Sequence, residues 1–269
     1  LTDCNNTVIL KVGVTELIVS VAQAQVFFLV FTRVMAVIIH IPNLGSSSIP
    51  NQVRIALGLI FAAVLIPWTP LPASQESLSL IAFAAEILKE IVVGTLIGYA
   101  AILTFGAISV AGETMGIGSG FGSDRIFNPA MEQSATPMGQ LFVVVAMLYF
   151  MTLNGHHIAI AALQKSFTVI PVNSALPTFS AETLIRTTAQ MILVGVQMAF
   201  PIFAALLLTD ITLALLSRVA PQVQFFFLGL PLKIGLSMIA LGLSIGIFFP
   251  YLRDLFNNLG DRMLSMVLK

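Results

Sequence analysis

The sequence predicts an all-α integral membrane protein whose helices are broken instead of being simple spans. Three observations predict this class. The 269 residues are 58% hydrophobic and only 9% charged, whereas about a quarter of the residues in soluble domains are charged. Six apolar runs approach the roughly 20 residues that cross a bilayer as a helix. Glycine and proline interrupt or divide several of these runs, as in proteins with discontinuous membrane helices.

The six apolar runs have unequal lengths. They cover about residues 17–41, 53–67, 78–111, 141–163, 184–216 and 234–252. The second is short, the third carries Glu86, Lys89 and Glu90 in its first half, and the fifth contains Pro201. This pattern favours hairpins and broken helices over a plain up-and-down bundle. No stretch has the mixed polar surface of a soluble domain, so we expect one membrane-embedded unit over residues 1–269.

Charge and cysteine content exclude several classes of protein. Twelve basic and twelve acidic residues give a net charge of zero, and without a basic cluster we expect no nucleic-acid partner. Cys4 is the only cysteine, so no intrachain disulfide is possible. The first apolar run is longer than a signal-peptide core and no basic cluster precedes it, so we expect no cleavable signal peptide.

Proline and glycine mark the connections between the runs. Loops are expected at residues 42–50, 67–72, 112–140, 170–177 and 220–231. The tail after Phe249 has apolar residues at helical spacing with charges opposite them. These apolar positions are Leu252, Leu255, Phe256, Leu259, Met263 and Met266. The tail is predicted either to lie on the membrane surface or to pack against a partner helix.

The segment from Gly112 to Gln140 is the longest interruption between apolar runs. Its first half has glycines at positions 112, 116, 118, 120 and 122, which allow positive φ and close approach of the backbone to a partner. We expect no regular helix there. Lipid cannot satisfy exposed backbone groups, so such a segment needs surrounding protein or a water-filled cavity. The leading interpretation is a loop that lines or blocks a pore.

Charged residues within apolar runs are expected to be paired or functional. Arg33 and Asp210 are predicted to make structural ion pairs or polar contacts, because residues of both signs are available. A helix end at the membrane interface explains the cluster of Glu86 and Glu90. Asp210 and Arg218 lie about two helical turns apart, so we expect each to contact a partner elsewhere and not the other.

No signature of an enzyme, a metal site or a cofactor site survives inspection. His156 and His157 lie at the end of the fourth run, but with only His40 besides them and no HExxH motif a metal site is not expected. The glycine string follows an apolar run and not a strand, which argues against a dinucleotide loop. Ser119 does not lie in a GxSxG motif. We therefore expect a non-enzymatic protein without cofactors.

Several blocks of residues together resemble the FliR family of flagellar biosynthetic proteins, whose injectisome relatives form the T component of the type III secretion export gate. The first blocks are Arg33, Pro42, Pro50, Val53, Arg54, residues 57–67, Ala111, Gly112, residues 120–122, Asn128 and Pro129. The most specific block lies within residues 206–233 and comprises Asp210, Arg218, Ala220, Pro221, Gln222, Phe225, Gly229, Pro231 and Lys233. The chain departs from the family's usual residues at Gln224, Ala214 and Asn128.

This resemblance implies the fold and the partners. The fold is an inverted pair of helical hairpins that resembles a FliP joined to a FliQ, with the FliP-like part at about residues 1–185 and the FliQ-like hairpin at about 186–269. FliP and FliQ are the implied partners in a hetero-oligomeric export gate, with FlhB and FlhA as further partners and unfolded flagellar proteins as cargo. The implied location is the bacterial inner membrane in the flagellar basal body, with the gate raised toward the periplasmic side and in contact with membrane lipid.

The resemblance also implies site residues. The family's plug is a loop that projects into the pore, and the glycine-rich segment occupies the corresponding position. The predicted plug comprises Glu113, Met115, Gly116, Ile117, Gly118, Gly120, Phe121 and Gly122. Met115, Ile117 and Phe121 would exclude water, because a hydrophobic constriction gates by dewetting. Glu113 and Asp124 would keep the ends of the segment in a wet vestibule. A plain surface connection is the alternative.

A second set of residues is predicted to be structural or to lie between subunits. It comprises Arg33, Pro42, Pro50, Arg54, Glu86, Asp210, Arg218, Pro221, Gln222, Gly229, Pro231 and Lys233. The prolines remove backbone donors where helices are expected to stop. The breaks at residues 42–50 and 220–231 are expected to face neighbouring subunits or a hairpin turn. The alternative function is a secondary transporter with discontinuous helices and Asp210 as its midplane carboxylate.

Overall fold

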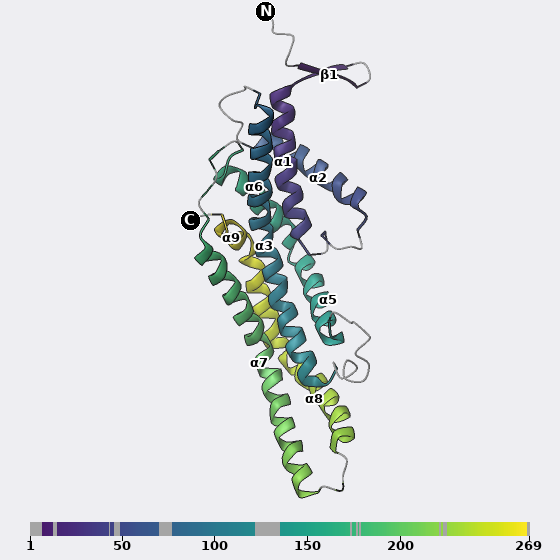
Figure 1. Ribbon diagram of the computed structural model, residues 1–269. Helices are drawn as coiled ribbons and strands as arrows, with labels where there is room; N and C mark the ends of the chain where they lie inside the picture. Colours follow the sequence, from purple (N-terminus) through teal and green to yellow (C-terminus); the bar gives the residue numbers. More distant parts are fainter. Residues whose placement is uncertain are drawn as a thin grey trace, which may run out of the picture. The chain divides into compact units, whose positions relative to one another are not determined.

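The computed structural model describes two compact helical units (Figure 1). Unit 1 comprises Leu1–Ile102, His157–Ala181 and Leu259–Lys269, and unit 2 comprises Leu103–His156 and Glu182–Asn258. Within these units the structure describes residues 7–12, 15–42, 44–45, 49–69, 77–121, 135–172, 174–175, 177, 179–220, 222 and 225–267. The long helix α3, Leu80–Ser119, contributes its first part to unit 1 and its second part to unit 2.

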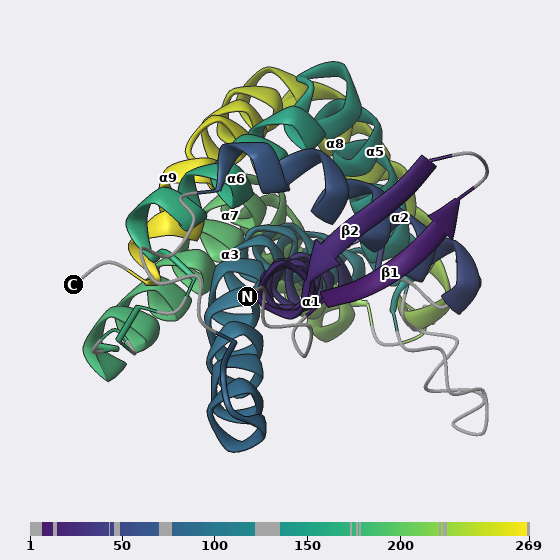
Figure 2. The same cartoon turned by 90° about the horizontal axis from the view of Figure 1, so that it is seen from above.

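Unit 1 begins with a short β-hairpin that the sequence analysis did not predict. Strands β1 (Thr7–Val12) and β2 (Thr15–Ser20) pair antiparallel, with Thr7 opposite Ser20 and Val12 opposite Thr15. The hairpin leads into α1, as the view along that helix shows (Figure 2). Both strands are rich in β-branched residues, which favour extended backbone. Apart from this hairpin the described chain is helical, so the prediction of an all-α membrane protein is confirmed.

In unit 1, α2, α3 and α6 contact α1, and α9 contacts α6. Helix α1 covers Val21–His40, α2 covers Asn51–Leu65 and continues into the 3₁₀ turn η1 at Ile66–Trp68, α6 covers Gly155–Val169 and α9 covers Leu259–Ser265. Helix α1 starts four residues later than predicted because Ser20 caps it. The Ser20 hydroxyl accepts from the Gln23 N–H at 3.2 Å, and the Gln23 side chain accepts from the Ser20 N–H at 3.1 Å, which together form a capping box.

Small residues let α1 and α3 approach closely. A Cβ added at Gly94 of α3 would lie 2.6 Å from the Ala36 Cβ and 2.8 Å from the Arg33 carbonyl oxygen. One turn later, a Cβ added at Gly98 would lie 2.5 Å from the His40 Cβ. Gly94 and Gly98, four residues apart, thus lie on one face of α3 and leave it without side chains there. Small residues of this kind let membrane helices approach closely and gain packing contacts.

Unit 2 consists of the second part of α3 with α5 (Pro137–Thr152), α7 (Ala181–Val219) and α8 (Phe225–Asn257). Its core holds a cluster of aromatic rings, with centroids 5.5 Å apart for Phe105 and Phe150 and 5.1 Å apart for Phe150 and Phe256. Helix α7 lies against α3 at Gly195, where an added Cβ would lie 2.5 Å from the Ala107 carbonyl oxygen. Edge-on aromatic packing joins α3, α5 and α8, and one backbone contact adds α7, so all four helices are connected.

Four helices are long and apolar enough to cross a membrane among the described residues, namely α1, α2 with η1, α3 and α7. The count rises to six if each of two bent helix pairs forms one span. The chain is an integral membrane protein, and broken helices are present. The fourth apolar run divides into α5 and α6 at Asn154, whose φ of 54° lies in the left-handed region. Helix α8 bends by 59° between Phe227–Leu243 and Phe248–Asn257.

Several predicted breaks are wrong because proline and glycine lie inside helices. Helix α7 continues through Pro201, and α8 begins at Phe225, so Gly229 and Pro231 lie in its first two turns. Proline has no N–H group. A helix tolerates this best near its start, where the N–H groups of the first turn have no partner within the helix, and Pro231 follows soon after the first turn of α8. The tail residues from Leu252 to Met266 that were predicted to form one apolar face are all buried. Of the two alternatives for the tail, packing against other helices is correct.

Candidate functional site

The end of α3 differs from the loop that the glycine pattern predicts. Helix α3 runs through Gly112, Gly116 and Gly118 and ends at Ser119, so the expectation that no regular helix forms there is wrong for residues 112–119. The physical reason is close packing against α5. A Cβ added at Gly112 would lie 2.8 Å from the Gly139 Cα and 3.0 Å from the Phe142 Cβ, so these glycines serve helix contact and not chain flexibility.

The positive φ that the sequence suggested for this segment occurs at one described glycine. Gly120 has φ +82° directly after the last helical residue, where a glycine in the left-handed conformation commonly ends a helix. The Gly120 N–H donates to the Ile117 carbonyl oxygen at 3.4 Å. Phe121 is half-buried, whereas Gly122 and Asp124 lie outside the described residues.

Glu113 holds the start of α5. Its Oε1 accepts a hydrogen bond from the Thr136 N–H at 2.7 Å, and the Thr136 hydroxyl accepts from the Gly139 N–H at 3.0 Å. Thr136 is the N-cap of α5, and Pro137 occupies the first helical position, a residue pair that favours a helix start. Glu113 therefore caps a helix end. Its carboxyl group also lies beside Gly139, and its side chain is half-buried, so the expectation that it lies in a wet vestibule stays a prediction.

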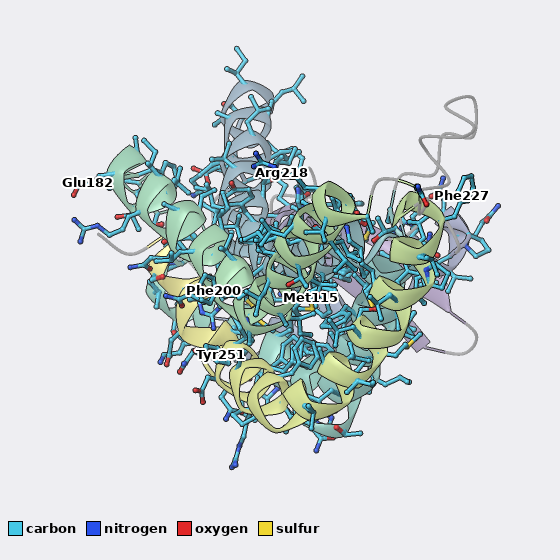
Figure 3. All side chains as sticks on the ribbon, turned by 90° about the horizontal axis from the view of Figure 1, so that it is seen from below. Met115, Glu182, Phe200, Arg218, Phe227 and Tyr251 are labelled. Atoms are coloured by element: carbon cyan, nitrogen blue, oxygen red, sulfur yellow. The ribbon has the colours of Figure 1, made fainter. Side chains whose placement is uncertain are left out.

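Met115 and Ile117 have opposite environments. Met115 is only 1% exposed, whereas Ile117 is 66% exposed. Met115 lines an apolar cavity of about 230 Å³ together with side chains from α5, α7 and α8, and it lies between the ribbons of α7 and α8 in Figure 3. The other lining residues are Leu141, Phe142, Val145, Met198, Pro201, Ile202, Leu241, Phe248, Phe249 and Tyr251. Met115 is thus part of the core of unit 2.

A network of four charged side chains is the main polar feature of unit 1. Arg33 of α1 forms an ion pair with Glu90 of α3, and both side chains are fully buried. The second contact of this pair joins Nη2 to the Glu90 Oε1 at 2.9 Å. Lys89 pairs with Glu86 and lies 3.9 Å from Glu90. The two positive and two negative charges balance, which keeps a buried network electrically neutral.

The explanation of Glu86 and Glu90 as a helix end at the interface is wrong for Glu90. Both residues lie beyond the first turn of α3, and Glu90 is fully buried. The cations of the network also bind the end of α6. Arg33 Nη1 donates to the carbonyl oxygens of Ser166 at 3.1 Å and Ile170 at 2.8 Å. Carbonyl groups at the end of a helix have no partner within the helix and carry negative partial charge, so a buried cation stabilises them.

Two further contacts complete this anchor. The guanidinium carbon of Arg33 lies 4.3 Å from the centroid of the Phe167 ring, a cation–π geometry. Lys89 Nζ donates to the Ser174 carbonyl oxygen at 2.8 Å. The network therefore joins α1, α3 and the end of α6, and its role is to fix helices. Among the described residues no group of three or more His, Cys, Asp or Glu side chains lies close enough to hold a metal ion.

Asp210 forms an ion pair with Lys233. The ion pair joins α7 to α8, and Lys233 is one of the residues of the same sequence block. The pair lies in a shallow pocket of mixed polar and apolar lining that also includes Leu213, Ser217 and Leu230. Arg218 is exposed near the end of α7, at the same end of the α7–α8 hairpin as Phe227 (Figure 3). The partner of Asp210 is thus on α8 and is not Arg218, which lies two turns further along α7, in line with the expectation from their spacing.

The remaining predicted residues lie mostly at helix ends. Pro42 follows Ile41, the C-cap of α1, and Pro50 is the N-cap of α2. Arg54 Nε donates to the Leu44 carbonyl oxygen at 3.1 Å and so fixes the turn between these helices. Gln222 is exposed between α7 and α8. Pro221 lies outside the described residues.

Sequence reasoning missed the partners of the predicted residues. Glu90 was grouped with a helix end, and Thr136 and Gly139 were not singled out. Thr136 precedes a proline at the start of an apolar run, which is a helix-start signal that was available. Gly139 carries no such signal, because its role depends on Glu113 of another helix.

The comparisons with known proteins agree on one family. The chain matches bacterial export proteins, family 1, over residues 24–259. It is 31% identical to the flagellar biosynthetic protein FliR of Caulobacter vibrioides over 82% of this chain and 90% of that protein. For FliR of Bacillus subtilis the identity is 30%, over 86% and 90% of the two chains.

A relative with a different name matches over a similar length. The Yop proteins translocation protein T of Yersinia pestis is 28% identical over 80% of this chain and 84% of that protein. The matched span, residues 24–259, covers the residues of the ion network and of the α3–α5 contact. Because the match covers most of the chain, this protein belongs to bacterial export proteins, family 1, the family that contains FliR.

Proposed function

We propose that the protein is a non-enzymatic subunit of the flagellar type III secretion export gate and forms part of the pore for unfolded flagellar proteins. The names of its relatives support this proposal, since several are flagellar biosynthetic proteins and one is a Yop translocation protein. Its partners would be FliP and FliQ within the gate, with FlhB and FlhA beside it. Its place would be the inner membrane at the flagellar basal body, with the gate raised toward the periplasmic side.

The observation that carries the proposal is the length of the exposed apolar surface on α7. The helix has 39 residues, which corresponds to about 58 Å at 1.5 Å per residue. Ile185 near one end is 70% exposed and Val219 at the other end is 82% exposed. Apolar residues in between are exposed as well, namely Ile192, Leu193, Val196, Phe200, Leu207, Leu208, Ile211, Leu215 and Leu216.

Lipid alone does not cover such a surface. The hydrocarbon core of a bilayer is about 30 Å thick, so a helix of about 58 Å would need a tilt of about 60° to remain inside it, whereas membrane helices tilt by about 0–40°. Part of the apolar face therefore lies outside the hydrocarbon, where water would meet it. Exposed apolar surface of this extent marks a protein interface. A subunit enclosed by neighbours has this property, and a transporter that works alone does not.

The gate of this pore would be formed at the end of α3 and the segment that follows it. Gly120 and Phe121 begin that segment, and Ile117 is exposed on the last turn of the helix. The apolar character of Ile117 and Phe121 supports a seal that excludes water. Met115, Gly116 and Gly118 would support the plug from within the helix. The alternative is that the segment only connects α3 to α5.

The pairing of Asp210 supports the gate over the secondary transporter. A transport carboxylate has to bind and release a coupled ion, whereas Asp210 forms an ion pair with Lys233. Exchanging the two charges in D210K/K233D keeps the pair, so we expect secretion to survive the exchange better than either single substitution. Ion uptake into vesicles that depends on Asp210, with assembly intact, would favour the transporter.

Affinity purification from native membranes tests the proposal. The tagged chain is expected to copurify with FliP and FliQ, and deletion of its gene is expected to abolish secretion of flagellar proteins. Expressed without the other subunits, the chain is expected to aggregate in mild detergent. A chain that purifies alone as a stable species, and whose loss leaves secretion unchanged, contradicts the proposal.

A further inference from the structure

Helix α5 begins with a capping box that is completed by a different helix. In the usual capping box, the third residue of the helix is Glu or Gln and its side chain accepts from the N–H of the N-cap residue. Here the N-cap is Thr136, and the third helical residue is Gly139, which has no side chain. The missing acceptor is supplied by Glu113 of α3, whose Oε1 accepts from the Thr136 N–H at 2.7 Å.

The glycines at this contact are required by the same arrangement. A Cβ added at Gly139 would meet the Glu113 carboxyl group, and a Cβ added at Gly116 would meet the Thr136 side chain. A Cβ added at Gly112 would lie 2.8 Å from the Gly139 Cα. Glycine at these three positions thus makes room for one carboxyl group and one threonine. The contact depends on geometry that bulkier residues would exclude.

Electrostatics strengthen the contact. The start of a helix carries partial positive charge, so a carboxylate placed there is stabilised. Thr136 is only 1% exposed, and a hydrogen bond between a charged acceptor and a buried N–H is stronger than one between neutral groups. Without Glu113 the Thr136 N–H would lose this acceptor in a buried position, which is unfavourable.

We propose that Glu113 is a positioning residue that holds the export gate closed by locking α5 to α3. This rests on the proposed function. The lock joins the last two turns of α3 to the first turn of α5, so the two ends of the chain segment that connects these helices are held side by side. Separation of the helices at this point requires the Glu113–Thr136 hydrogen bond to break. The bond therefore adds to the free energy that separates the closed gate from the open gate.

The experiment measures leakage of small solutes and ions through the complete gate in cells that lack export cargo. E113A removes the acceptor, whereas E113Q keeps an oxygen at the same position. G139A leaves Glu113 in place, but the Cβ added at position 139 displaces the Glu113 carboxyl group. The control is G106A on the same helix, because a Cβ added at Gly106 has no neighbour within 4 Å. Copurification with FliP and FliQ is measured for every variant.

We expect E113A and G139A to assemble at wild-type levels and to leak about tenfold more than the wild type. This is the factor that follows from losing one hydrogen bond to a charged group. E113Q is expected to leak more than the wild type but less than E113A, because its amide oxygen keeps a weaker, neutral hydrogen bond to the Thr136 N–H, and G106A is expected to remain tight. Rescue by glutamine separates a hydrogen-bond role from a role of charge alone.

Three outcomes overturn the proposal. If E113A and G139A assemble and remain tight, the lock does not hold the gate. If both fail to assemble while E113Q does, Glu113 is needed for assembly and is not a gating residue. If E113Q leaks as much as E113A, the hydrogen bond is not the cause. Failure of the proposed function is recognised separately, because deletion of the whole gene would then leave secretion intact.

Discussion

At the scale of residues, the charged side chains of unit 1 form a structural anchor. Arg33 makes its contacts with Glu90 and with the carbonyl oxygens of Ser166 and Ile170 inside a fully buried site. Each donor group of a buried guanidinium needs an acceptor, because an unpaired charge in an apolar interior is strongly unfavourable. The carboxylate supplies the charge and the carbonyl groups supply the remaining acceptors.

We predict that R33A lowers the free energy of unfolding by about 3–5 kcal/mol, because it leaves Glu90 as a buried charge without its main partner. The double substitution R33M/E90M removes both charges and leaves the pair of Lys89 and Glu86 balanced. It is expected to recover most of the loss. Thermal unfolding of the purified complex in detergent measures both effects.

The control for this prediction is an exposed ion pair. Arg186 and Glu182 pair at 2.9 Å on α7, with side chains that are 70% and 77% exposed. Such pairs contribute little in solvent, so R186A is expected to leave the unfolding temperature unchanged. A double substitution that is as unstable as R33A would mean that the carbonyl contacts and not the ion pair carry the stability.

The sequence predicted that the charges in apolar runs would be paired, but not which residues would pair. Arg33 and Asp210 are in separate ion pairs, with Glu90 and Lys233. The choice depends on which helices lie side by side, and hydropathy contains no such information. Composition and charge balance therefore indicate that a neutral network exists, while the packing of the helices determines its members.

At the scale of elements, α3 shows how packing overrides intrinsic preference. Glycine is unfavourable in a helix by about 1 kcal/mol relative to alanine, and this led to the expectation of a loop at residues 112–119. The helix persists because Gly112 allows contacts of its backbone with Gly139 and Phe142, and Gly116 with Thr136. The lengths of the apolar runs predicted α1 and α7 within a few residues, since those helices depend on hydrophobic length and not on a specific neighbour.

We predict opposite effects for two alanine substitutions on α3. In G94A the added Cβ would lie 2.6 Å from the Ala36 Cβ and 2.8 Å from the Arg33 carbonyl oxygen, so α1 has to move. Overpacking of this kind costs about 1–3 kcal/mol. In G106A the added Cβ has no neighbour within 4 Å, and the gain in helix propensity is up to about 1 kcal/mol.

Both substitutions change glycine to alanine in the same helix, so the difference between their unfolding temperatures isolates the packing contact. We expect G94A to unfold at a lower temperature than the wild type and G106A at the same or a higher temperature. Equal shifts for the two variants would show that the contact between α1 and α3 is too loose to matter.

At the scale of the whole molecule, the proposed function requires that something other than lipid covers part of the apolar face of α7. The half of the helix that ends at Val219 carries a dense group of these apolar residues beside the exposed Arg218. Six residues between Leu207 and Val219 are at least 48% exposed and apolar, and Phe227 on α8 adds a seventh that is 67% exposed. The other end carries the exposed ion pair of Glu182 and Arg186, which suits contact with water.

We therefore predict that a partner subunit covers Val219 in the assembled gate. In a C4S background, a cysteine in V219C is expected to be protected from a membrane-impermeant maleimide in native membranes and to react once the chain is separated from its partners. A photo-crosslinking residue at the same position is expected to link to protein. The control is E182C, whose position is 77% exposed in its side chain and is expected to react in both states. Rapid labelling of V219C in native membranes, or crosslinks to lipid alone, would show that this end of α7 is not an interface. The hairpin of α7 and α8 would then have to be stabilised by contacts within the chain itself.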